Sequence, residues 1–130
     1  MESIRISFVA LFVIIAGLAG CSGNEGSCAN DEEFCALINA ENFDGTGPVI
    51  DDYLEGLRSK LSDEEKLDRL VDWLECKSCV KRADIICNSC IYTNPPQSEL
   101  KIVFVINEVQ VERILDIQMR DPLLFSGFHN

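Results

Sequence analysis

The chain has 130 residues and carries 22 Asp and Glu against 11 Lys and Arg, which gives a formal net charge of −11. This acidic balance excludes a protein that holds nucleic acid by neutralising its phosphates, and it disfavours a basic footprint on anionic lipid. The length fits one domain of ordinary size, and 47% hydrophobic residues are typical of a chain that folds. A single His leaves little room for His-rich metal sites or catalytic triads.

The first 20 residues differ in composition from the rest of the chain. Arg5 is their only cation, and an apolar run follows from Phe8 to Ala16. The segment from Ile6 to Gly20 is shorter than the about 20 apolar residues that a bilayer-spanning helix needs. It has the length of the hydrophobic region of a signal peptide. We therefore expect residues 1–20 to be a signal peptide.

The end of this segment, Leu18-Ala19-Gly20-Cys21, resembles the lipobox of bacterial lipoprotein precursors. The resemblance implies a thioether-linked diacylglyceryl group on Cys21, cleavage between Gly20 and Cys21, and acylation of the new amino terminus, for example with palmitate. Two or more acyl chains would anchor the protein durably, because each buried CH₂ contributes about 0.8 kcal/mol. The expected location is the bacterial cell envelope outside the cytoplasm, on either the inner or the outer membrane. An ordinary secretory signal and an uncleaved anchor are the alternatives.

We expect residues 21–33 to hold the lipidated Cys21 and a polar tether, and residues 34–130 to form a single domain. The tether is indicated by residues 22–27, which contain no apolar residue. The segment from Cys28 to Asp44 is expected to be irregular or one short helical turn that is fixed to the core.

Two helices are predicted next. The first follows Thr46-Gly47-Pro48, and Ile50, Tyr53, Leu54 and Leu57 form one helical stripe in it. The second begins at a capping box formed by Ser62 and Glu65. Its apolar positions repeat the same spacing, and Trp73 beside them is expected to pack in the core. With a break near residues 59–61, the two helices form an antiparallel pair.

Strands are predicted from Val80 onward. The first covers 80–87, a Pro-containing loop follows at 94–98, and strong strands cover 100–106 and 109–117 with a tight turn between them. The tail, 121–130, could add an edge segment, and we expect its penultimate residue, His129, to be mobile. The predicted fold class is α+β, with an antiparallel helix pair packed on a small antiparallel sheet of about three strands.

The strand at 102–106 is apolar on both of its faces. A strand with one face in water should alternate between apolar and polar residues. This run is therefore either a buried central strand, with the amino-terminal segment covering its second face, or an exposed face that meets a protein partner.

The chain contains 7 Cys, and lipidation of Cys21 would leave an even set. In an exported chain, we favour structural disulfides among them. The candidates for disulfides or metal binding are Cys28, Cys35, Cys76, Cys79, Cys87 and Cys90.

Zinc is a second interpretation, because Cys76/Cys79 and Cys87/Cys90 form two Cys-x-x-Cys units. If residues 80–86 are extended at about 3.3 Å per residue, the units stand roughly 25 Å apart. One ion would then require this stretch to fold back. Thiol–disulfide exchange is a third interpretation, although neither unit precedes a helix, where a thiolate is stabilised.

A short segment, Cys87 to Cys90 together with Asn94 to Glu99, resembles part of small proteins of the Bacteroidota, and no activity comes with this resemblance. The sequence contains no phosphate-binding Gly-rich loop and no nucleophile elbow. We therefore expect a membrane-anchored envelope lipoprotein that is a non-enzymatic binding or structural module without a cofactor. The alternative is an envelope thiol–disulfide or zinc-binding protein that uses the two Cys-x-x-Cys units.

Overall fold

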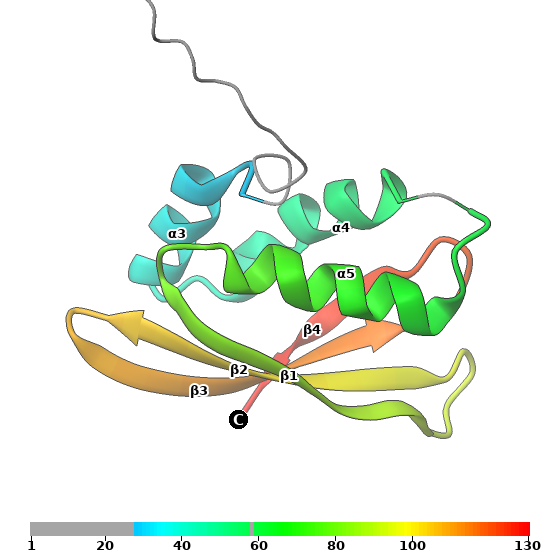
Figure 1. The fold of residues 1–130 in the computed structure, drawn as a ribbon. Coiled ribbons are helices and arrows are strands. Elements are labelled where there is room, and N and C mark those ends of the chain that lie inside the picture. The colour runs from blue at the N-terminus through cyan, green and yellow to red at the C-terminus, as the bar shows by residue number, and fades with distance from the viewer. Residues whose placement is uncertain (1–27, 58) are drawn as a thin grey trace, which may run out of the picture.

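A computed structural model describes residues 28–57 and 59–130. The predicted signal peptide, Cys21 and most of the predicted tether lie outside these residues. The described chain is α+β, as predicted: three α-helices lie on one face of a four-stranded antiparallel sheet (Figure 1). The helices are α3 (Asp31–Asn39), α4 (Gly47–Glu55), which follows the 3₁₀ turn η3 (Asp44–Thr46), and α5 (Asp63–Glu75).

The strands follow one another in the sheet in chain order. The tail that could add an edge segment forms a complete strand on β3, so the sheet has four strands instead of about three. The strands are β1 (Val80–Ile91), β2 (Gln97–Ile106), β3 (Val109–Gln118) and β4 (Leu124–His129).

The segment before η3 is more regular than predicted. Residues 31–39 form a helix of 9 residues, which begins at Asp31, inside the stretch assigned to the tether. Phe34 and Ile38 are fully buried on this helix. The N-cap residue, Asn30, makes no side-chain capping bond, so tertiary contacts, this burial among them, stabilise the helix.

The capping box that predicts α5 is present. The Glu65 N–H donates to Ser62 Oγ (3.1 Å), and the Ser62 N–H donates to Glu65 Oε1 (2.8 Å). Because two of the unsatisfied N–H groups at the helix start are paired in this way, α5 begins where the sequence indicates. Trp73 is buried as expected, with its ring stacked on Tyr53 at 4.8 Å between centroids.

The hairpin between β2 and β3 is also as predicted. Asn107 and Glu108 both have positive φ, 52° and 66°, which suits the two-residue turns that join antiparallel strands. The register that follows pairs Ile106 with Val109 and continues without a shift to Gln97 and Gln118. β2 begins at Gln97, so the predicted strand boundary at residue 100 was too late.

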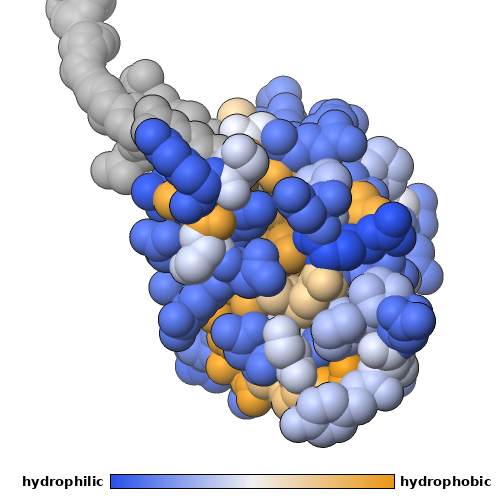
Figure 2. Space-filling view, turned by 90° about the vertical axis from the view of Figure 1, so that its right-hand side faces the viewer, coloured by the Kyte–Doolittle hydropathy of each residue, from blue (hydrophilic) through white to orange (hydrophobic). Residues whose placement is uncertain are grey.

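β2 is a central strand, which accounts for its apolar run. Ile102 and Phe104 are buried under the helices, and Val103 is buried on the opposite face, which we call the open face. Helix α3 contacts β2 on the same side as the other helices (Figure 1), so it does not cover the open face. Figure 2 shows the side of the molecule that faces right in Figure 1. Hydrophilic side chains cover much of this side, and hydrophobic ones show between them.

Candidate functional site

Four of the six described cysteines join the amino-terminal segment to the junction between α5 and β1. Cys28 lies at disulfide distance from Cys76, and Cys35 from Cys79, with Cα–Cα distances of 5.2 and 5.7 Å. We call these two the amino-terminal bridge pair. They close long loops, with sequence separations of 48 and 44, and such bridges stabilise a fold by constraining its unfolded chain.

Polar contacts reinforce the same junction. Asp31 accepts hydrogen bonds from the Ser78 N–H (2.6 Å) and hydroxyl (3.0 Å). Between the two bridges, Lys77 is only 2% exposed, and its ammonium donates to the Ala29 carbonyl at 2.6 Å. Burial lowers the pKa of Lys77 to about 8, and the Asp31 carboxylate opposes this shift. The junction is therefore both a covalent and a polar attachment point for the amino-terminal segment.

The third cysteine pair is different. Cys87 and Cys90 lie at disulfide distance within one Cys-x-x-Cys unit, at a sequence separation of 3. The unit forms an irregular part of the edge strand β1, where the register against β2 shifts, and Cys90 is exposed. The Ser89 N–H, between the two cysteines, donates a hydrogen bond to the hydroxyl of the buried Ser98 at 2.7 Å, which attaches the unit to β2. The strand thus continues past Cys87, the predicted end, to Ile91.

These pairings bear on the zinc interpretation. Cys76 and Cys79 are paired with the amino-terminal segment, whereas Cys87 and Cys90 are paired with each other. A sulfur atom in a disulfide is not a thiolate, and the thiolate is the zinc ligand. A zinc site at the two units would therefore require the bridges to be reduced first.

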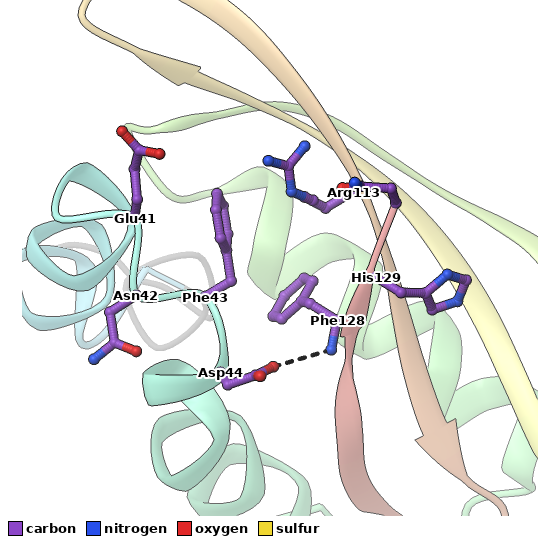
Figure 3. Close-up of a pocket in the computed structure, with 8 residues that line it drawn as sticks. Glu41, Asn42, Phe43, Asp44, Arg113, Phe128 and His129 are labelled. Carbon is purple, nitrogen blue, oxygen red and sulfur yellow. Dashed lines mark hydrogen bonds between the residues drawn. The ribbon is translucent and has the colours of Figure 1, made fainter.

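A hollow of about 450 Å³ lies where the segment after α3 meets β3 and β4 (Figure 3). It is lined by residues 41–44, Arg113 and residues 128–130, and we call it the Arg113 hollow. The rings of Phe43 and Phe128 approach each other in it, with centroids 5.9 Å apart. The Phe128 N–H donates to Asp44 Oδ1 (3.1 Å), which fixes β4 to the segment on the opposite wall.

Arg113 supplies the positive charge of the hollow. Its guanidinium lies 4.9 Å from the Phe43 ring centroid, and Nη1 donates to the Glu112 carbonyl at 2.8 Å. Within residues 28–57 and 59–130, no carboxylate forms a salt bridge with Arg113. A guanidinium stacked on an aromatic ring, with donors still available, is suited to bind a carboxylate or phosphate group.

Beside the hollow, three side chains meet on the open face of the sheet. Nε2 of His129 lies 3.3 Å from Asp116 Oδ1 and 3.4 Å from Glu99 Oε2. We call Glu99, Asp116 and His129 the acid–histidine cluster. Burial raises the pKa of the Asp116 carboxyl, His129 opposes this shift, and Glu99 adds to it. His129 was expected to be mobile, but it is the last residue of β4 and its ring lies against both carboxylates.

Sequence reasoning missed both the Arg113 hollow and the acid–histidine cluster. One signal could have found part of the cluster: a two-residue turn at Asn107-Glu108 places Glu99 directly opposite Asp116. No comparable signal places His129, because the pairing of β4 with β3 shifts register between Asp116 and Ile117.

Comparison with protein-family models, with curated proteins and with solved structures finds no match to this chain. In the described residues, every helix is too short or too polar to span a lipid bilayer.

Proposed function

We propose that this protein is a lipid-anchored module of the bacterial cell envelope that binds another molecule and does not catalyse a reaction. The observation that carries the proposal is the pairing of the cysteines: all six that follow Cys21 lie in three disulfide pairs. The cysteine left over is the one in the lipobox. Disulfides persist in exported proteins, so the pairing supports the same compartment as the lipobox does.

The anchor is tested by the intact mass of the protein purified from its membrane, before and after alkylation. We expect a chain that begins at Cys21 and carries lipid, with no thiol alkylated before reduction and six alkylated after it. Incorporation of labelled palmitate should be lost in Cys21→Ser and retained in the wild type. A mass that retains residues 1–20, or free thiols in the native protein, would contradict the proposal.

The Arg113 hollow is the proposed binding site. Arg113 can receive an anionic group, and the Phe43 and Phe128 rings can pack against a flat apolar one. Phenylacetate carries both groups and serves as a simple probe.

We expect saturable changes in the Phe43 and Phe128 ring signals by NMR, with affinity in the millimolar range, about −4 kcal/mol. Arg113→Gln should weaken binding at least about tenfold, since a charged hydrogen bond contributes about 1.5–3 kcal/mol. Arg120→Gln, at an exposed position outside the hollow, is the control. Equal binding by all three proteins would remove the hollow from the proposal.

A second candidate function is thiol–disulfide exchange at Cys87 and Cys90. It is favoured by the exposure of Cys90 and by a bridge that closes within one unit on an edge strand. A thiolate of an external dithiol would attack Cys90 Sγ, and Cys87 would leave as a thiolate. The second thiol of the dithiol would then release Cys90, so that the dithiol is oxidised and the bridge is reduced.

This second function is tested by mixing the protein with stoichiometric dithiothreitol and following thiol–disulfide exchange. Wild type should exchange faster than Cys87→Ser/Cys90→Ser, which keeps the amino-terminal bridge pair. Equal rates for the two proteins would exclude it.

A further inference from the structure

We propose that Glu99, Asp116 and His129 form a binding site for one divalent first-row transition-metal ion. The site goes beyond the proposed function and does not depend on it. His129 borders the Arg113 hollow, but its ring points away from it (Figure 3), and the groups proposed to bind a ligand there are Arg113, Phe43 and Phe128. Three consecutive strands supply them: Glu99 from β2, Asp116 from β3 and His129 from β4. A hydrogen-bonded sheet holds such positions more firmly than a loop does.

The spacing of the donor atoms fits one ion. Two ligands that are each about 2.1 Å from a metal at a tetrahedral angle lie about 3.4 Å apart. Nε2 of His129 is 3.3 Å from the Asp116 oxygen and 3.4 Å from the Glu99 oxygen. All three donor atoms lie within 4.8 Å of one another, so an ion between them requires only a small approach of the two carboxylates.

The two neighbouring carboxylates of the acid–histidine cluster favour a bound cation. Glu99 and Asp116 are direct partners in the β2–β3 register, and like charges opposite each other destabilise a sheet. Their side chains are also largely shielded from water, with exposures of 23% and 20%. His129 offsets the two negative charges only when its imidazole is protonated. A bound metal ion would instead take the neutral imidazole and both carboxylates as ligands.

The donor set indicates the class of ion. One imidazole and two carboxylates suit Zn²⁺, Mn²⁺ or Fe²⁺, whereas Ca²⁺ and Mg²⁺ prefer oxygen ligands alone. Three protein ligands leave a position open to water, and the His129 side chain is 50% exposed. The site is therefore one where the ion can enter from solvent without opening the fold.

The chain contains one His, so the imidazole signals in an NMR spectrum of the full-length protein report this site alone. We expect Zn²⁺ to shift the Nε2 resonance of His129 and to saturate at one equivalent, and Mn²⁺ to broaden the same signal. The bridges are left oxidised, and Mn²⁺ has little preference for sulfur ligands, so binding to cysteine is separated from binding at the cluster.

Two variants complete the experiment. Asp116→Asn should weaken Zn²⁺ binding at least tenfold, while Glu112→Gln, an exposed neighbour on β3 outside the cluster, should bind as the wild type does. His129 signals that stay unchanged at saturating Zn²⁺ and Mn²⁺ would overturn the proposal, and the cluster would then be an ion pair without metal. Unweakened binding by a folded Asp116→Asn would overturn it too. The NMR titration of the wild-type protein tests the proposal even where a variant fails to fold.

Discussion

The ammonium of Lys77 lies 4.0 Å from the centre of the Trp73 ring, and it also donates a 2.6 Å hydrogen bond to the Ala29 carbonyl. One contact reaches back along α5, and the other reaches the segment before α3. A cation over an aromatic ring and a charged hydrogen bond both offset the hydration that a buried ammonium loses. Lys77 therefore joins the end of α5 to the amino-terminal segment in addition to the two bridges.

The first prediction concerns the pH dependence of this contact. The pKa of Lys77 is about 8 in the folded protein, against an ordinary value of about 10.4 for lysine. Between these pH values the unfolded chain binds more protons than the folded one, so this group makes the free energy of unfolding rise as pH increases. We expect the free energy of unfolding to rise with pH in the wild type and this rise to be absent in Lys77→Met. Denaturant titrations at pH values from about 7.5 to about 10.5, which span the folded and unfolded pKa values, measure it. Parallel curves for the two proteins would show that Lys77 titrates normally.

The second prediction concerns the amino-terminal bridge pair. When one bridge is present, the other closes only a short additional loop. Removing either bridge while the other remains should therefore lower the free energy of unfolding by about 3 kcal/mol. Removing both should cost about 7 kcal/mol, which is more than the sum of the single effects. Cys-to-Ala pairs and the combined variant are compared by denaturant unfolding. Cys87→Ser/Cys90→Ser is the contrast, with an expected cost of about 2 kcal/mol because its loop is short. Equal costs for all three bridges would contradict the chain-entropy account.

The third prediction concerns the start of α5. Ser62→Ala removes the acceptor for the Glu65 N–H and should cost about 1 kcal/mol of stability. Ser62→Thr keeps an acceptor at the same position and should cost much less. Thermal unfolding at neutral pH measures both, and equal losses would mean that the capping bond contributes nothing.

The fourth prediction concerns the contact between α4 and β4. A Cβ at Gly47 would lie 2.7 Å from a ring carbon of Phe125, so Gly47→Ala must displace this ring or the strand. We expect net destabilisation despite the higher helix propensity of Ala. Phe125→Leu should cost less in the Gly47→Ala background than in wild type, with a coupling of about 0.5–3 kcal/mol. Additive effects in this double-mutant cycle would mean that the ring moves away freely.

The elements that were predicted well are those with a local signal. Ser62 and Glu65 mark the start of α5, and Asn107-Glu108 marks the turn that sets the register of β2 and β3. Helix α3 has no side-chain cap and is held by burial and by the bridge from Cys35. Because these contacts come from residues far away in the chain, periodicity over so few residues did not reveal it.

The candidate site was less accessible to prediction for the same reason. Which cysteines pair cannot be deduced from their spacing alone. In the structure, the first Cys-x-x-Cys unit is paired with cysteines of the amino-terminal segment, whereas the two cysteines of the second unit are paired with each other. Arg113 meets Phe43 only because the segment after α3 passes over β3. His129 reaches Asp116 only because β4 changes register near its middle. Both contacts depend on the packing of the whole domain.

The bridge between Cys28 and Cys76 also has a mechanical consequence. Residues 29–75, which include all three described α-helices, lie within the covalent loop that this bridge closes. A pulling force that enters at Cys28 and leaves through the sheet passes across the bridge directly into the chain before β1. The helices are thereby spared the tension, and the load falls on the strands.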